Sequence, residues 1–380
     1  MRAWSVAVPR GRAEEIRRML TERGVLMQHL RIVQAGDRIL LPTTERLEIG
    51  LPTEEREFES GFVAIRSYKD LVEVPDRLRA SLPSSFDVIG DIAVMRIPEE
   101  LRPDQEAIGG AILRWNPRIR VVMDDRGVKG DHRVRDIGVI AGERRTTTVH
   151  VEHGLRYRVD LAAAYFSPRL ASERKRIADS VQEGEIVADP FAGVGPYAIL
   201  IARRRRPRAV HASDANPLAV ALLRANIAAN RADRIEAREG DARTILREIA
   251  PVDRIVLDLP HSALEFLPDA LAAIGARGTI HLYRILPEAE EVQTIQHIRT
   301  AARAAGLRVT DLRRRHVRAY SPTQNQTAFD VTVARGSRLS GPGRSPTAGR
   351  TSRRRANRAS GRRSEQTGRR SGSRSGRPRR

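Results

Sequence analysis

Four aspartates in the second half of the chain each follow a predicted strand. They are Asp189, Asp214, Asp241 and Asp258, and the short apolar run before the first of them is typical of a buried parallel strand. In open α/β sheets, ligands bind outside the carboxyl ends of the strands. One aspartate at such a place is more often a helix cap or a solvated turn. Four at the same sheet edge predict a binding site.

The first of these aspartates opens a glycine turn at residues 189–195, between a predicted strand at 185–188 and a predicted helix at 196–202. Strand, glycine turn and helix form the opening unit of a doubly wound α/β fold. Gly193 and Gly195 carry no Cβ, so the backbone can approach a ligand closely. The helix N-terminus offers unpaired N–H groups. A tight turn without a ligand is the alternative that this motif leaves open.

The second aspartate indicates which ligand to expect. Asp214 lies about 25 residues past the start of the turn, where a carboxylate holds the two hydroxyls of a ribose. The dinucleotide fingerprint requires a third glycine that this turn lacks, and Pro196 follows the second glycine. These departures favour S-adenosylmethionine over NAD as the cofactor.

Further elements complete an α/β domain over residues 161–335. Helices are predicted at 217–230, 265–273 and 288–305, and a fifth strand at 278–283. Two strands at 315–317 and 328–333 come after the last helix, which fits the antiparallel edge of a class I (Rossmann-like) methyltransferase domain.

Two smaller α/β modules are predicted before this domain. Residues 1–45 contain a strand, a helix at 12–23 and two more strands, and the polar segment 46–83 is interpreted as a connector. Residues 84–160 contain a hairpin at 86–96, a helix at 102–115 and strands at 118–123 and around 149–159.

Composition narrows the class of protein. The 380 residues include no cysteine, which excludes disulfides and thiol catalysis, and no apolar stretch is long enough to span a membrane. The first residues lack the features of a signal peptide. We therefore expect a cytoplasmic protein that has no membrane partner, and we expect a monomer.

Positive charge is concentrated at the end of the chain. Residues 336–380 contain fifteen arginines and one glutamate, a formal charge of +14 out of +21 for the whole chain. Such a composition cannot pack a core, so we predict a disordered basic tail that binds phosphates without sequence preference. A solubilising extension is the alternative. The rest of the chain is mildly basic as well, and both regions favour a nucleic acid as the partner.

Several segments together resemble a known family. They are His132-Arg133-Val134-Arg135, Phe166-Ser167-Pro168-Arg169-Leu170, Ser172-Glu173-Arg174, the turn at 189–196, Asp214-Ala215-Asn216-Pro217 and Asp258-Leu259-Pro260. In order and spacing, residues 1–335 resemble the archaeal and eukaryotic tRNA (guanine-37-N1) methyltransferases. That family shares a superfamily with the aminocarboxypropyl transferases of wyosine formation.

The resemblance implies a partner, a cofactor and residue roles. The partner is tRNA, contacted at the anticodon loop and, through the first module, at its outer corner. Glu173 becomes the general base, Arg133 its partner at guanine O6, and Asp258 a third catalytic group. S-adenosylmethionine would be held by Arg174, Asp189, Phe191, Gly193, Gly195, Asp214, Ala215, Asp241, Ala242 and Asp258. From the residues alone, an ion pair of Glu173 with Arg169, and an ordinary surface position for Arg174, are the alternatives.

One departure from the family keeps a second reaction open. The family's methyltransferases have Asn-Leu-Pro where this chain has Asp258-Leu259-Pro260, and an ionised aspartate can only accept hydrogen bonds. Aminocarboxypropyl transfer to a wyosine precursor is therefore the alternative reaction, although Gly195-Pro196 resembles the methyltransferases. A non-catalytic RNA-binding protein is the third possibility, and the four strand-end aspartates argue against it.

Overall fold

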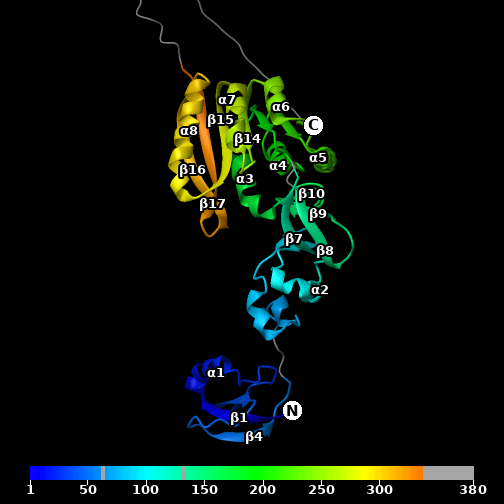
Figure 1. The fold of residues 1–380 in the computed structure, drawn as a ribbon, viewed down its shortest axis with the longest axis vertical. Coiled ribbons are helices and arrows are strands. Elements are labelled where there is room, and N and C mark those ends of the chain that lie inside the picture. Colours follow the sequence, from blue (N-terminus) through cyan, green and yellow to red (C-terminus); the bar gives the residue numbers. More distant parts are fainter. Residues whose placement is uncertain (61–64, 131–133, 337–380) are drawn as a thin grey trace, which may run out of the picture. The chain divides into compact units, whose positions relative to one another are not determined.

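The computed structural model describes residues 1–60, 65–130 and 134–336 (Figure 1). The basic tail at 337–380 and the segment 131–133 lie outside the described residues. None of the described helices is both long and apolar enough to cross a lipid bilayer.

The first sheet is antiparallel and has the strand order β2-β3-β1-β4. Its elements are β1 (Arg2–Pro9), α1 (Ala13–Glu22), β2 (Val33–Ala35), β3 (Arg38–Thr43) and β4 (Thr53–Glu57). The helix packs Ile16 and Leu20 against Val6, Val8 and Leu41 of the sheet. Because β4 pairs with β1, this sheet extends beyond the predicted limit at residue 45. The sequence hid β4 because it is a largely exposed, charged edge strand without an apolar pattern.

The second sheet has the order β5-β6-β7-β8 and packs against α2 (Gln105–Trp115). Its strands are β5 (Asp87–Ile89), β6 (Ile92–Met95), β7 (Val121–Lys129) and β8 (Val134–Gly142). Tyr68, Val72 and Leu78 are buried in the same core. The interpretation of 46–83 as a mere connector is therefore wrong, since its first part completes one sheet and its second part fills the core of another.

A two-stranded ribbon follows, formed by β9 (Thr147–Glu152) and β10 (Leu155–Asp160). The sequence predicted one strand around 149–159, but the chain reverses there at His153 and Gly154, both of which have positive φ. Tyr157 and Val159 of β10 are buried with residues of β6 and β7 and with Val194 and Ile199 of the large domain. The ribbon therefore joins the second sheet to the large domain.

The large sheet has seven strands in the order β13-β12-β11-β14-β15-β17-β16. The parallel strands are β11 (Ile186–Asp189), β12 (Ala209–Asp214), β13 (Ile235–Glu239), β14 (Val252–Leu257) and β15 (Ile274–Leu286). The antiparallel edge is formed by β16 (Leu307–Ser321) and β17 (Gln324–Arg335). Both edge strands are longer than predicted, but their order and direction agree with the prediction.

Six α-helices accompany this sheet in the described part of the domain (Figure 1). They are α3 (Ala171–Ser180), α4 (Pro196–Arg204), α5 (Pro217–Asn230), α6 (Ala242–Ile249), α7 (Leu267–Ala273) and α8 (Glu291–Ala304). One core contains α3 and α4, and a second contains α7 and α8. The predicted doubly wound α/β architecture is confirmed. Its strand order reverses between β11 and β14, and such switch points are where ligands bind.

Candidate active site

A cavity of about 380 Å³ lies at the carboxyl ends of the parallel strands. Its wall includes the glycine turn after β11, the ends of β12 and β14, and the loop that leads into α3. Its volume falls in the range of small-molecule binding sites. The position is the one that the strand-end aspartates predicted.

The glycine turn is shaped by contacts that only glycine permits. Gly195 has a φ of 92°, and a Cβ there would lie 2.4 Å from Leu223 Cδ1. Gly193 has a φ of 53°, and its N–H donates to Asp214 Oδ2 at 2.8 Å. The other oxygen of Asp214 accepts from the N–H of Asn216 at 2.9 Å. Asp214 therefore fixes the turn as well as lining the cavity.

Two further aspartates sit in surroundings that disfavour their charge. Asp189 is fully buried, and no side chain among the described residues donates to its carboxylate, although the backbone N–H groups of Phe191 and Ala198 lie close enough to favour its charge. Burial, with added repulsion from Asp258 and Asp214, raises the pKa of Asp189 to about 8. Burial also raises the pKa of Asp258 to about 6, although the nearby Arg174 opposes this rise. Both carboxyls are therefore suited to a cationic neighbour.

The fourth aspartate has a different environment. Asp241 is half exposed and caps α6, accepting from the N–H groups of Arg243 at 3.0 Å and Thr244 at 3.2 Å. This is the helix-cap role that a lone aspartate at a strand end usually has. Asp241 and the following Ala242 nevertheless line the cavity.

Most residues expected to hold the cofactor lie in the cavity wall. These are Arg174, Phe191, Gly193, Asp214, Ala215, Asp241, Ala242 and Asp258. Asp189 and Gly195 do not line it; Gly195 instead packs against Leu223 and Ile199.

Arg174 is a buried residue, so its interpretation as an ordinary surface position is wrong. Its guanidinium donates to both oxygens of Glu152 at 2.8 and 2.5 Å and to the carbonyl of Ser167 at 3.0 Å. It also lies 5.3 Å from the ring centre of Phe166. The bidentate partner Glu152 comes from β9, and no sequence pattern pointed to it.

Glu173 is also buried, but it does not line the cavity. Its carboxylate accepts hydrogen bonds from Tyr283 Oη at 2.8 Å and from Arg176 Nε and Nη2 at 2.9 and 2.6 Å. The ion pair considered from sequence, with Arg169, is wrong because Arg169 binds Asp87 at 2.5 Å. Glu173 thus lies in a polar cluster beside the cavity. Arg133, expected to act with it, lies outside the described residues.

The closing strands contribute wall residues that the sequence did not reveal. Arg318 and Tyr320 of β16 and Gln326 of β17 line the cavity, and Arg318 Nε donates to Gln326 Oε1 at 2.8 Å. Tyr165, in the loop before α3, also lines the cavity. Arg318, Tyr320 and Gln326 belong to one hairpin, and the antiparallel pairing of β16 with β17 makes Arg318 and Gln326 cross-strand partners.

Comparisons with known proteins agree with this architecture. Residues 148–310 match the model of the TRM5/TYW2 methyltransferase domain, and residues 69–146 match the TYW2 N-terminal domain. The chain is 40% identical over 332 residues to a tRNA (guanine(37)-N(1))-methyltransferase, Trm5b, from Pyrococcus abyssi. The match covers 87% of this chain and 99% of that protein. The chain belongs to the TRM5/TYW2 family.

Solved structures of relatives have the same fold. The crystal structure of wild-type Trm5b from Pyrococcus abyssi matches with a TM-score of 0.67 at 38% identity, over 87% of this chain and 99% of that one. The protein in a complex of aTrm5 with tRNALeu matches with a TM-score of 0.62 at 28% identity, over 86% and 99%. The family resemblance noted from the sequence motifs, and the methyltransferase fold predicted with it, are confirmed.

Proposed function

We propose that this protein transfers a methyl group from S-adenosylmethionine to N1 of guanine 37 in tRNA. The observation that carries the proposal is the cavity at the strand ends, bounded by the glycine turn and by the carboxylates of Asp214, Asp241 and Asp258, in a member of this family. Its proposed substrate is tRNA, bound at the anticodon loop. We propose that the first sheet contacts the outer corner of the same tRNA. We also propose that the protein acts as a cytoplasmic monomer.

The cavity wall suits the proposed cofactor. Asp214 follows β12, where a carboxylate can hold ribose hydroxyls, and the glycine turn leaves backbone exposed beside it. Phe191 and Phe266, whose ring centres lie 4.9 Å apart, give the wall an aromatic surface suited to adenine. Asp258 offers a carboxylate to a cationic amine or sulfonium. When bound, S-adenosylmethionine supplies a methyl group already activated by the sulfonium charge.

Glu173 is the proposed general base. Guanine N1 carries a proton and is a poor nucleophile, and a carboxylate within about 3 Å can remove that proton. Glu173 must turn from Arg176 towards the cavity to reach a base bound there. Arg133 is proposed to donate to guanine O6, where negative charge develops. Asp258 is proposed to accept from the guanine amino group or from the cofactor amine.

The test is methyl transfer with labelled cofactor to an unmodified tRNA transcript. Label at position 37 is expected, and its absence would reject the proposed function. In the Glu173→Gln variant, turnover is expected to fall by roughly 10²-fold or more, the typical contribution of a general base. Cofactor affinity, measured by calorimetry, is expected to stay nearly unchanged. The control is Glu183→Gln, which changes an exposed glutamate just after the same helix.

Aminocarboxypropyl transfer to a wyosine precursor is the second candidate. Two observations favour keeping it: Asp258 stands where the methyltransferases have asparagine, and residues 69–146 match the TYW2 N-terminal domain. Cofactor labelled in its carboxyl group separates the two reactions, because only this one moves that carbon onto RNA.

A further inference from the structure

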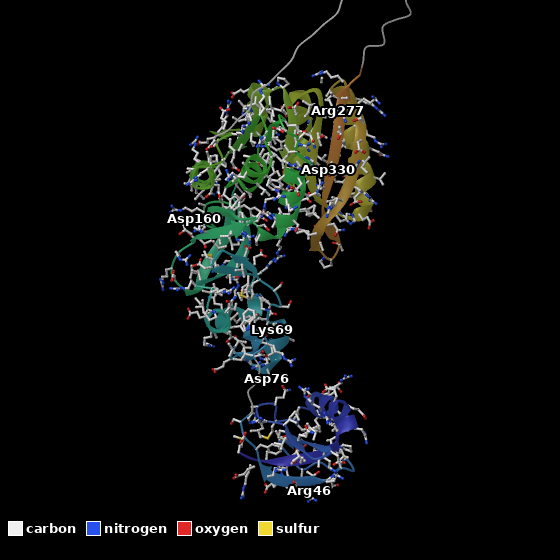
Figure 2. The ribbon with its side chains drawn as sticks, turned by 180° about the vertical axis from the view of Figure 1, so that it is seen from behind. Arg46, Lys69, Asp76, Asp160, Arg277 and Asp330 are labelled. Atoms are coloured by element: carbon white, nitrogen blue, oxygen red, sulfur yellow. The ribbon has the colours of Figure 1, made fainter. Side chains whose placement is uncertain are left out.

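A continuous polar network, buried at Glu173, His281 and Arg254 and partly buried elsewhere, extends from Glu173 across the large sheet. Its central member is Arg176 on α3, whose guanidinium bridges two carboxylates. It binds Glu173, and it also donates from Nη1 to Asp330 Oδ2 at 2.5 Å and from Nη2 to Asp330 Oδ1 at 3.1 Å. Asp330 lies on β17, near the antiparallel edge (Figure 2). One cation therefore serves two acids.

Asp330 is held from its other side by His281. His281 Nδ1 lies 2.6 Å from Asp330 Oδ1, and the two residues are cross-strand partners on β15 and β17. His281 Nε2 lies 2.7 Å from Arg254 Nη1. A guanidinium can only donate, so His281 Nε2 accepts the hydrogen bond from Arg254. The ring hydrogen is therefore on Nδ1, and Nδ1–H donates a hydrogen bond to Asp330. Burial lowers the pKa of His281 despite the hydrogen bond to Asp330, so the ring is neutral.

The network is anchored at the far end from Glu173. Arg254 donates to both oxygens of Glu185 at 2.7 and 3.0 Å and to the backbone carbonyl of Ser180 at 3.1 Å. Burial opposes the charge of Asp330, but the hydrogen bonds from His281 and Arg176 outweigh it and lower its pKa. Asp330 is therefore a fixed and ionised partner for Arg176, whether or not Glu173 stays in place.

We propose that Arg176 and Asp330 are positioning residues for Glu173: Arg176 holds the glutamate beside the cavity, and Asp330 keeps Arg176 paired once Glu173 is released. This inference rests on the proposed role of Glu173 as general base. Removing a proton from guanine requires Glu173 to leave Arg176 and then to become neutral. Arg176 is partly buried, and a partly buried guanidinium left without a partner is unfavourable. Asp330 removes that obstacle, because it already holds the same guanidinium.

Charged and titratable groups face Glu173 from every element packed around it. Arg176 on α3 favours the ionised glutamate, whereas Asp330 on β17 and Asp258 after β14 oppose it by like-charge repulsion. Tyr283 on β15 donates a hydrogen bond, and the buried Tyr197 on α4 lies close enough to interact electrostatically. Removing Arg176 or Asp330 must therefore shift the protonation of Glu173 in opposite directions.

The experiment is single-turnover methyl transfer by the full chain over a range of pH. In Asp330→Asn, Glu173 is the one carboxylate of the pair that still binds Arg176. The acid limb, which is the part of the profile where the rate rises with pH, should therefore move to lower pH, and the plateau rate should fall about tenfold. Arg176→Gln removes the cation, so the acid limb should move to higher pH, by about one unit or more. Cofactor affinity should change little in either variant.

A conservative variant separates positioning from general damage to the fold. Arg176→Lys keeps the charge but loses the bidentate geometry, so its acid limb should stay near that of the wild-type chain. Circular dichroism checks that each variant folds. If Asp330→Asn does not fold, the comparison of Arg176→Gln with Arg176→Lys tests the positioning role by itself. The inference would be overturned if the acid limbs of Asp330→Asn and Arg176→Gln moved in the same direction, or if Arg176→Gln and Arg176→Lys had identical acid limbs. Either result leaves the proposed function standing as long as the wild-type chain methylates position 37. Failure of the wild-type chain to methylate position 37 would instead reject that function.

Discussion

Replacing Asp189 by asparagine should stabilise the ligand-free protein at alkaline pH. The carboxyl of Asp189 is fully buried at the end of β11; no side chain among the described residues donates to it, and the backbone N–H groups of Phe191 and Ala198 offset the burial only in part. Burial raises its pKa to about 8, with Asp258 and Asp214 adding repulsion. Asparagine has nearly the same shape and never ionises, so it removes the cost of a buried negative charge.

The magnitude follows from the difference between the folded and unfolded states. An aspartate in an unfolded chain has a pKa of about 3.9, about 4 units below that of Asp189 in the folded protein. The folded state therefore binds the proton more tightly, and this contribution to stability is lost as pH rises from about 4 to about 8. At about 1.4 kcal/mol per unit, the loss reaches about 5 kcal/mol at most. The variant escapes that loss, so its advantage should be about 1.5 kcal/mol at pH 5 and should approach this limit at pH 9.

Urea unfolding followed by circular dichroism at pH 5, 7 and 9 measures the difference. Asp241→Asn is the matched control, because it changes a half-exposed aspartate at a neighbouring strand end and asparagine also caps helices. The control should show the pH dependence of the wild-type chain. A variant at Asp189 with that same pH dependence would refute the reasoning, since it would mean that Asp189 is already hydrated or paired.

Two further predictions concern the glycine turn and the tail. Gly195→Ala should cost about 2–5 kcal/mol of stability, from left-handed backbone strain plus the contact with Leu223, whereas Gly184→Ala, with similar φ but open space, should cost about 1–2 kcal/mol. Equal losses in urea unfolding would exclude the close contact. Deleting residues 336–380 should weaken tRNA binding and reduce its salt dependence in filter-binding titrations. An unchanged salt slope would show that the arginines of the tail do not contact the RNA.

Local patterns predicted the parallel half of the large domain well. The strands β11 and β14 contain short apolar runs that an aspartate follows, and the glycine turn marks the switch point without any need for distant contacts. The edge strands were predicted too short because β16 is rich in exposed arginines, which interrupt an apolar pattern. The strand β4 was missed for the same reason. Edge strands commonly carry such charges, which discourage pairing with other chains.

Neighbouring residues on α3 show where sequence reasoning ends at the site. Glu173 and Arg174 are adjacent, and the helix looks polar, so neither was predicted to be buried from the residues alone. Successive residues on a helix point about 100° apart. Arg174 consequently lines the cavity and binds Glu152 of β9, while Glu173 binds Tyr283 of β15. These partners come from distant parts of the chain, so the periodicity of residues within α3 cannot reveal them.

The buried acids at the strand ends have a common physical explanation. Burial opposes the ionisation of Asp189 and Asp258, with added repulsion from Asp258 and Asp214 at the first and from Glu173 at the second, and this lowers the stability of the ligand-free protein near neutral pH. A neutral ligand would not relieve this cost, whereas a cationic one favours the ionised carboxylates directly. The sulfonium and amine of the proposed cofactor carry such charge. The site therefore favours positively charged ligands. Binding such a donor removes the electrostatic cost of ionising the two carboxyls, and the free energy recovered in this way adds to its affinity.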